Sequence, residues 1–380
     1  MTPSPTFVHT TRLPIASGKT LPGRYFTSAA VFAEEMERIF TRQWICVGPA
    51  DRIRKAGEYF VEQLGADSII VLRDKTGAVR AYHNVCRHRG TRICEASAGK
   101  FGETIQCPYH AWTYGLDGHL IATPSADQLK GFDKGDYPLF PVPIAVWEGF
   151  VFVNFGADPA PFDKTHESLI GRFSRFRIPD LTVARRIDYD VAANWKLIVE
   201  NYQECYHCAP IHPTLTKLSP PTSGEMDLYD GPVLGGYMLL APDNDTMSMS
   251  GFSCGMTVSP DLPTDDLRRI YYYSIFPNVL LSMHHDYVML HTLFPVAVDR
   301  TRITCEWLFH PESLDESRFN PDDGIAFWDM TNREDWHICE QSQRGVSSPA
   351  YRPGPYSARE NLSAAFDKEV LRALGHSGEE

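Results

Sequence analysis

The stretch that decides the fold is residues 84–90, Asn-Val-Cys-Arg-His-Arg-Gly, together with residues 106–112, Gln-Cys-Pro-Tyr-His-Ala-Trp. The pattern is Cys-x-His, a gap of 18 residues, and then Cys-x-x-His. Thiolates hold iron–sulfur clusters, and neutral imidazoles raise the reduction potential of the iron that they bind. Two segments that each supply one thiolate and one imidazole therefore predict a [2Fe–2S] cluster with cysteines on one iron and histidines on the other. The predicted ligands are Cys86, His88, Cys107 and His110.

This split ligand set is that of a Rieske centre, and a structural zinc site is the alternative, because Cys2His2 also suits tetrahedral zinc. Zinc sites more often pair two cysteines in one loop and two histidines in another, whereas each loop here mixes the two types. Trp112 is either a shield of the cluster from water or an ordinary core residue. The other cysteines are expected to be core residues or ordinary thiols: Cys46, Cys94, Cys205, Cys208, Cys254, Cys305 and Cys339.

Composition narrows the class of protein. The chain has 380 residues, with 36 Lys plus Arg against 48 Asp plus Glu and a net charge of −12. This length suggests two or three domains, and 43% hydrophobic residues suffice for a full core. The acidic balance argues against nucleic acid and anionic membranes as partners, and we find no apolar run of about 18 residues. Nine cysteines without a recognisable secretory signal favour a reducing cytoplasm.

Short strands are predicted to dominate the region around the Cys/His motifs. Ser28 is a typical N-cap, and apolar spacing favours a helix from there to about Arg42. Strands are expected at residues 59–64, 68–73, 78–83 and 150–155, with turns at 74–77 and 117–118. We interpret residues 44–155 as an all-β domain that holds the cluster. Residues 1–43 are expected to form an arm and a helix that pack on a second domain.

The second domain, residues 156–380, is predicted to mix helices and an antiparallel sheet. A strand is expected at 183–191, then a helix at 195–208 that is capped by Asn194 and stopped by Pro210. Further strands are expected at 271–283, 287–295 and 302–310, and helices at 322–341 and 358–374. The fold class is therefore α+β, with a sheet backed by helices.

A second metal-binding pattern lies in that helix and just beyond it. Glu200, Glu204 and His207 fall at helical spacing, which predicts that they share one face. If Pro210 breaks the helix, His212 can turn back toward His207. Two histidines and one carboxylate on one face of a ferrous ion leave three positions open for oxygen and water, as in non-haem iron oxygenases.

The third ligand must come from a distant segment, and residues 327–337 offer several carboxylates. We favour Asp335, with Asp329 as the second choice. Asn201 is either a residue that orients the iron ligands by hydrogen bonding or a polar packing residue. Glu204-x-x-His207 and Glu334-x-x-His337 also match a di-iron carboxylate site, but that site needs four long helices, which the strands predicted between residues 271 and 310 argue against.

Together, and in this order, the motifs resemble the large (alpha) subunit of Rieske non-haem iron oxygenases. The similarity runs from about Arg24 to Leu374 and is most specific at residues 86–90, 107–112 and 204–212. The resemblance implies an N-terminal Rieske domain and a catalytic domain with a helix-grip-like sheet. It further implies that the four Cys/His residues hold the [2Fe–2S] cluster. The ligands that it implies for a mononuclear iron are His207, His212 and Asp335.

The resemblance also implies how electrons travel. Glu204, three residues before the first iron histidine, would link that iron to His110 of the partner subunit, so a homotrimer is expected. A partner reductase containing flavin and iron–sulfur groups would supply electrons from NAD(P)H. The chain itself shows no Gly-x-Gly-x-x-Gly fingerprint for binding the nicotinamide.

The predicted substrate is a quaternary ammonium compound. Most ring-hydroxylating members carry Asp where this chain has Glu204, and Glu resembles the branch that oxidises glycine betaine, choline, carnitine and stachydrine. The implied reaction is O2-dependent hydroxylation of an N-methyl group followed by N-demethylation. A cation without N–H groups is held by aromatic faces. Aromatic candidates, most of which are expected in the core, are Tyr202, Tyr206, Tyr271, Tyr272, Tyr273 and Trp307.

Two other functions stay open at this point. One is a ring-hydroxylating or O-demethylating oxygenase that acts on an aromatic acid. The other is an electron carrier or zinc-stabilised scaffold without catalytic activity, which would have no need of His207, His212 and Asp335.

Overall fold

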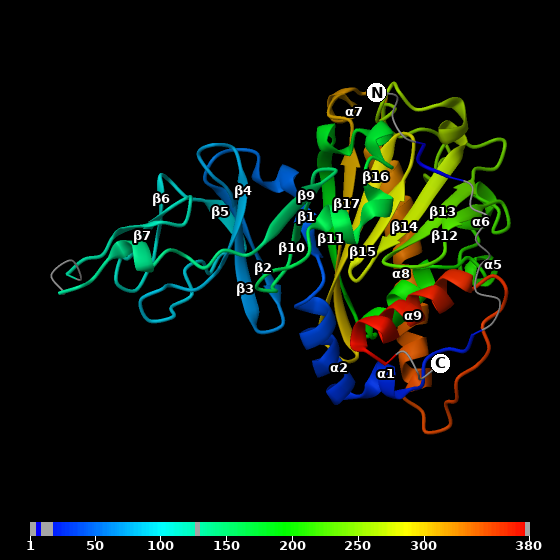
Figure 1. Cartoon of the computed structure of the whole chain (residues 1–380). Helices are drawn as coiled ribbons and strands as arrows, with labels where there is room; N and C mark the ends of the chain where they lie inside the picture. The colour runs from blue at the N-terminus through cyan, green and yellow to red at the C-terminus, as the bar shows by residue number, and fades with distance from the viewer. Residues whose placement is uncertain (1–4, 9–17, 126–129, 377–380) are drawn as a thin grey trace. The chain divides into compact units, whose positions relative to one another are not determined.

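The computed structural model describes residues 5–8, 18–125 and 130–376 (Figure 1). The chain forms two compact units, one of residues Trp44–Pro159 and the other of residues Met1–Gln43 with Ala160–Glu380. We call them the small unit and the large unit. The predicted N-terminal arm lies partly at residues 1–4 and 9–17, which are outside the described residues.

The small unit is built of short antiparallel strands, as predicted. Its largest sheet has the order β4-β3-β2-β5, and two three-stranded sheets have the orders β1-β10-β9 and β6-β7-β8. The strands are β1 (Ile45–Pro49), β2 (Glu58–Leu64), β3 (Asp67–Arg73), β4 (Val79–His83), β5 (Ala98–Lys100), β6 (Thr104–Gln106), β7 (Thr113–Gly115), β8 (Leu120–Ala122), β9 (Ile144–Trp147) and β10 (Phe150–Val153).

Both predicted cluster loops leave this sheet framework at strand ends. The first loop follows β4, and the second joins β6 to β7. Each loop closes on itself through the backbone, since the Gly90 N–H donates to the Cys86 carbonyl and the Cys107 N–H donates to the Trp112 carbonyl. Gly90 has a φ of 73°, a left-handed conformation that glycine adopts without strain. The two loops therefore hold their Cys and His residues on tight turns.

The large unit contains a seven-stranded antiparallel sheet in the order β11-β17-β16-β15-β14-β13-β12 (Figure 1). Its strands are β11 (Thr182–Val191), β12 (Glu225–Leu228), β13 (Val233–Leu239), β14 (Arg269–Ile275), β15 (Val279–Met283), β16 (Tyr287–Ala297) and β17 (Arg300–Phe309). The prediction of one strand over 271–283 is wrong, because a hairpin at Phe276–Asn278 divides it into β14 and β15. The hairpin residues are buried like the strands beside them, and the turn signal of Pro277 and Asn278 was not recognised in the sequence.

Helices pack beside this sheet. They are α1 (Arg24–Thr27), α2 (Ala29–Glu35), α3 (Phe162–Thr165), α4 (Trp195–Tyr202), α5 (Cys208–Ile211), α6 (Leu215–Leu218), α7 (Glu312–Asp315), α8 (Pro321–Val346) and α9 (Asn361–Leu374). Ser28 caps α2 and Asn194 caps α4, as predicted. Helix α4 contacts α8, α9 and β16, which places it at the centre of the unit. Along the described residues, no helix is long and apolar enough to cross a membrane.

The prediction of one helix from Trp195 to Cys208 is wrong. Helix α4 ends at Tyr202, and Pro210 lies inside the short helix α5 instead of ending a long one. The Glu204 carboxylate accepts hydrogen bonds from the backbone N–H groups of Tyr206 and His207. Such local bonds compete with the helical ladder, so the chain turns here and Glu204 and His207 do not continue the face of α4.

A buried ion pair ties α2 to α4. The Lys196 ammonium lies 2.5 Å from Glu35 Oε1, and both side chains are fully buried. The Trp195 indole N–H donates to the other Glu35 oxygen at 2.9 Å. Every polar atom of the Glu35 carboxylate is therefore matched by a donor, which is the condition under which a buried charge pair is tolerated.

We predict that breaking this pair lowers stability strongly. Lys196→Met leaves the Glu35 carboxylate buried without its cation and should lower the free energy of unfolding by about 3–5 kcal/mol in urea titrations. The control is Arg185→Ala, because the Arg185–Asp322 pair is largely exposed and should contribute less than about 1 kcal/mol. Equal effects of the two substitutions would contradict the prediction.

Candidate metal centres

The four Cys/His residues of the small unit meet in two pairs. Cys86 and Cys107 are buried, at 3% and 2% exposure, whereas His88 lies exposed and His110 half-buried. The rings of His88 and His110 meet edge to face, with centroids 4.7 Å apart. Burial and the neighbouring Cys86 thiol raise the pKa of Cys107. The sulfur ligands thus lie in the core and the nitrogen ligands at the surface.

Two aromatic residues support this site. Trp112 is buried in the same core cluster as the two cysteines, and its ring stacks on His88 with centroids 4.8 Å apart. The Tyr114 hydroxyl lies 3.3 Å from Cys86 Sγ, and it also accepts the Arg87 backbone N–H. Hydrogen bonds to a ligand sulfur raise the reduction potential of an iron–sulfur cluster.

The arrangement does not suit one tetrahedral zinc ion. Among the described residues, the only group of three or more His, Cys, Asp or Glu ligand atoms that gather around one point lies elsewhere, at His207, His212 and Asp335. Zinc needs all four of its ligands about one centre. Two separate pairs fit a cluster with two irons better.

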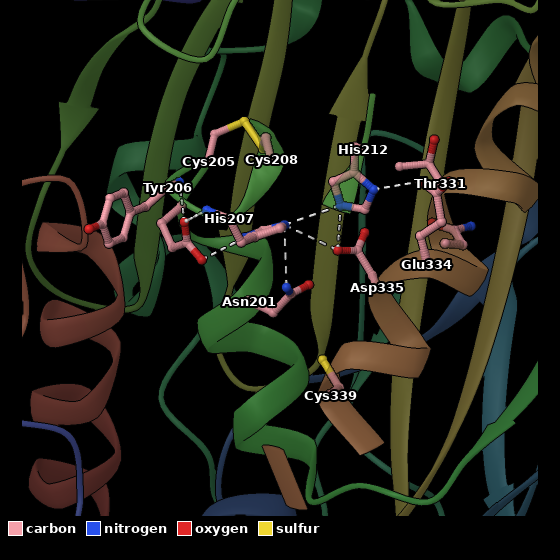
Figure 2. A network of polar contacts seen from close by, with 12 residues as sticks. Asn201, Cys205, Tyr206, His207, Cys208, His212, Thr331, Glu334, Asp335 and Cys339 are labelled. Atoms are coloured by element: carbon pink, nitrogen blue, oxygen red, sulfur yellow. Dashed lines mark hydrogen bonds and ion pairs between the residues drawn. A yellow bond between two sulfur atoms is a disulfide. The ribbon is translucent and has the colours of Figure 1, made fainter. Parts of the chain in front are cut away.

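The large unit brings His207, His212 and Asp335 together (Figure 2). Asp335 Oδ1 lies 3.2 Å from His207 Nε2 and 2.9 Å from His212 Nε2. The two Nε2 atoms are 3.2 Å apart. Ligand atoms bonded at about 2.1 Å and at right angles would be about 3.0 Å from one another, so the triad has the spacing of one face of an octahedron.

Two further carboxylates hold the histidines from behind. The Nδ1 of His207 lies 2.6 Å from Glu204 Oε1, and the Nδ1 of His212 lies 2.7 Å from Glu334 Oε2. A carboxylate on Nδ1 fixes the tautomer that leaves Nε2 free to bind a metal. Sequence reasoning considered Glu334 only as a possible iron ligand or a di-iron residue, and did not identify this role.

The charges of the site favour a cation at its centre. Burial lowers the pKa of His207, but hydrogen bonds to Asp335 and Glu204 raise it more, so the net effect is a pKa raised to about 10. Burial alone would raise the pKa of Asp335, yet its hydrogen bonds to the two histidines lower it. The anionic carboxylate and the two imidazoles therefore form a ligand set that a divalent ion would stabilise.

The other residues singled out from the sequence fall in different places. Asn201 Nδ2 lies 3.4 Å from His207 Nε2, beside the triad. Asp329 instead accepts hydrogen bonds from Tyr189 and Arg333, and His337 is exposed. The di-iron alternative is therefore wrong, since His337 does not reach the site and strands surround it.

A pocket opens beside the triad and carries aromatic walls. Tyr272 lines it, whereas Tyr271 and Tyr273 are fully buried, because alternate residues of a strand point to opposite faces of the sheet. Tyr202 and Trp328 also line the pocket. Trp328 was not predicted, although it lies seven residues before Asp335 on α8, a spacing that places both on one helix face. The remaining aromatic candidates, Tyr206 and Trp307, are exposed and buried in the core respectively.

Two cysteines differ from the prediction. Cys205 and Cys208 form a disulfide that spans Tyr206 and His207 (Figure 2). They are three residues apart in a tight turn, so local geometry brings their side chains together. The other five cysteines outside the cluster site are buried thiols, as predicted.

Comparisons with known proteins agree with this geometry. Residues 178–376 match the family model of the ring hydroxylating alpha subunit (catalytic domain), and residues 43–133 match that of the Rieske [2Fe-2S] domain. The glycine betaine monooxygenase oxygenase subunit of Chromohalobacter salexigens is 31% identical, over 89% of this chain and 82% of that protein. The carnitine monooxygenase oxygenase subunit of Acinetobacter baumannii is 37% identical, over 88% of this chain and 86% of that protein.

The fold agrees as well. A solved structure of a quaternary ammonium Rieske monooxygenase, described for its carnitine oxidation and inter-subunit electron transfer, superposes with a TM-score of 0.82 and 27% identity. The match covers 95% of this chain and 96% of that one. The resemblance inferred from the motifs is thereby confirmed: the chain belongs to the Rieske non-haem iron oxygenases, as an alpha subunit with a Rieske [2Fe–2S] domain and a mononuclear iron domain.

Proposed function

We propose that this chain is the terminal oxygenase of a monooxygenase that hydroxylates an N-methyl group of a quaternary ammonium compound, with glycine betaine as the first candidate. The observation that carries the proposal is that the pocket containing His207, His212 and Asp335 is also walled by aromatic rings. The relatives described above act on glycine betaine and carnitine by name.

The aromatic wall suits a cation that cannot donate hydrogen bonds. Tyr272 meets Tyr202 and Trp328 edge to face, with centroids 6.1 Å and 6.3 Å apart. The Tyr202 hydroxyl donates to the Leu281 carbonyl at 2.9 Å, so its ring is held in place. Ring faces attract a quaternary ammonium by about 0.5–2 kcal/mol each. An aromatic acid carries no cation and would gain no such attraction from the ring faces.

We assign the metal ligands as the sequence predicts. Cys86 and Cys107 would hold one iron of the cluster, and His88 and His110 the other. His207, His212 and Asp335 would hold the mononuclear iron, which supplies the activation of O2 when bound. All three residues line the substrate pocket, and Asn201 lies near enough to His207 to orient the ring.

The chain's residues then determine what the reaction does. The aromatic wall would place an N-methyl carbon beside His207, His212 and Asp335 and keep water from it. The balanced reaction is RH + O2 + 2 e⁻ + 2 H⁺ → ROH + H2O. The hydroxymethyl product is a hemiaminal, whose C–N bond breaks to release formaldehyde and the demethylated amine.

We predict that Asp335 is required for iron and Asp329 is not. Asp335→Asn removes the anionic ligand and should lower mononuclear iron content and turnover at least tenfold, while the Rieske absorption spectrum persists. Asp329→Asn alters a carboxylate on the same helix that contacts Tyr189 and Arg333, and should keep its iron. Iron analysis beside the visible spectrum checks both variants, and full iron in Asp335→Asn would reject the assignment.

We further propose that Glu204 passes electrons to His207 from His110 of the partner subunit in a homotrimer. An NAD(P)H-dependent reductase with flavin and iron–sulfur groups would reduce the cluster. Three features support the path. The histidine pair lies on the exposed side of the cluster site, and Glu204 bonds His207 directly. Tyr206, two residues after Glu204, is 56% exposed, so this turn lies at the surface of the large unit.

The Glu204 proposal predicts a defect in electron transfer without loss of metal. Glu204→Gln should retain both centres but slow the oxidation of the reduced cluster by O2 and substrate about tenfold or more in stopped-flow measurements. Glu334→Gln is the matched control, because it alters the equivalent carboxylate on His212. Cluster oxidation at the wild-type rate in Glu204→Gln would show that electrons take another route.

The substrate class is tested with the complete system of oxygenase, reductase and NADH. Glycine betaine, carnitine and choline should give O2 uptake that matches formaldehyde release, and an aromatic acid should not. Trp328→Leu removes one ring and should raise KM about 5- to 30-fold. Tightly coupled uptake with the aromatic acid alone would overturn the proposal in favour of a ring-hydroxylating or O-demethylating oxygenase.

A further inference from the structure

Two buried carboxyl groups face each other behind the proposed iron site. Glu200 lies on α4 and Asp367 on α9, and their carboxyl groups lie within hydrogen-bonding reach of each other. Asp367 is only 4% exposed. Glu200 Oε1 and Asp367 Oδ1 are buried and have no hydrogen-bond donor. Two carboxylates are acceptors only, so a hydrogen bond between them requires a proton on one of them.

The surrounding charges do not remove the need for that proton. Lys196 lies one turn before Glu200 on α4, but its ammonium is paired with Glu35. The Tyr356 hydroxyl donates a hydrogen bond to Asp367 Oδ2 at 2.7 Å, and Tyr351 lies near Tyr356. This buried group therefore contains three carboxyls and one ammonium. Burial, with the neighbouring Asp367 charge, raises the pKa of Glu200, and burial raises the pKa of Asp367 to about 7.

A cavity connects this pair to the iron site. It has a volume of about 430 Å³ and is lined by Glu200 and Tyr356 as well as by Asn201, Glu204 and His207. The last three residues also line the substrate pocket. They therefore form a partition that separates the substrate pocket from a second cavity, whose wall combines polar side chains such as Glu200, Tyr351 and Tyr356 with apolar ones. A cavity of this size with several polar groups in its wall can hold hydrogen-bonded water.

We propose that Glu200 and Asp367 together store one exchangeable proton and supply it through this cavity to the reduction of oxygen on the other side of the partition. The inference rests on the oxygenase function proposed above. That reaction consumes two protons and two electrons for each O2, and the reductase supplies the electrons. The carboxyl O–H bond breaks, the proton passes along water in this cavity as far as the partition and crosses it to the oxygen that is being reduced, and an O–H bond of the product water forms. Solvent then restores the proton to the pair.

The route keeps proton supply apart from the substrate. The aromatic pocket must stay dry to hold an ammonium group by ring faces, and a wet path through it would compete with the substrate. The second cavity reaches His207 and Asn201 from the side away from these rings. Glu200 and Asp367 touch neither substrate nor iron, so their role is to store and pass a proton.

The proton itself can be observed by infrared spectroscopy on the intact protein. Wild type should show a protonated-carboxyl C=O band that shifts in D2O and disappears as the pH rises through the pKa of the pair. Glu200→Gln and Asp367→Asn should each lose it. Either amide can still donate a hydrogen bond to the remaining carboxylate, so the fold should persist. Tyr351→Phe alters a hydroxyl that lines the same cavity without bonding the pair, and should keep the band.

Turnover supplies the second readout. Glu200→Gln and Asp367→Asn should lower kcat on the order of 10²-fold and abolish the decline of wild-type activity above neutral pH, with KM and iron content unchanged. Tyr356→Phe removes a donor to the ionised form, so it should raise the pKa of the pair and move this decline to higher pH. Tyr351→Phe should follow the wild-type profile.

Several results would overturn the proposal. These are the absence of the infrared band in wild type, or wild-type rates and pH dependence in both amide variants. If the variants fail to fold, two measurements on the wild-type protein decide the question. One is the titration of the infrared band, and the other is turnover in D2O, which should be slower than in H2O. An absent isotope effect would then reject it. If no quaternary ammonium compound is oxidised, the substrate proposal fails, but NADH-driven O2 reduction still tests the proton route.

Discussion

The structure of the large unit depends on the approach of two imidazoles and one carboxylate to within 3.2 Å of one another. Three such groups gather at this spacing only when the surrounding chain holds each of them. Glu204 and Glu334 do so by binding the Nδ1 atoms of the histidines, and α8 carries Asp335. A divalent ion at the centre would replace contacts between charged and polar atoms with metal–ligand bonds.

Helix α4 and the turn that follows it connect every part of this site. Lys196 anchors the helix to the N-terminal segment, Glu200 faces Asp367 on α9, and Asn201 reaches His207. The helix ends where the Glu204 carboxylate binds the backbone of the next turn. The same carboxylate also bonds the His207 ring, so the residue proposed to carry electrons is the one that shapes the turn. A change at Glu204 would therefore alter both the turn and electron transfer, and a change at Glu334 controls only for the loss of a carboxylate bond to an iron histidine.

Which metal ligands are buried and which are exposed also bears on function. In the small unit, the cysteines are buried and the histidines face outward, so the imidazole side of the cluster is the accessible one. In the large unit, His207 lies between two cavities, one with aromatic walls and one that contains carboxyl, amide and hydroxyl groups. Substrate and protons would thus approach the site from different sides.

Some elements follow from local sequence and others do not. The strands at β2, β3 and β4 and the caps Ser28 and Asn194 were predicted correctly, because alternation and capping are local properties. The end of α4, the division of 271–283 into two strands and the Cys205–Cys208 disulfide were not. The end of α4 follows from side-chain bonds of Glu204, whereas the turn at Pro277-Asn278 and the Cys205–Cys208 pair are local features whose signals were not recognised.

By itself, the sequence determined the two iron chemistries, because ligand type and spacing within each motif are short-range information. It also determined the α+β class, because periodicity reports which faces are buried. Only the tertiary structure decided which carboxylate on α8 meets the histidines, which one supports His212, and which aromatic residues enter the pocket. Which side chains meet depends on how α8 and the sheet pack against α4. These elements are separated by many residues along the chain, so no local sequence pattern predicts their packing.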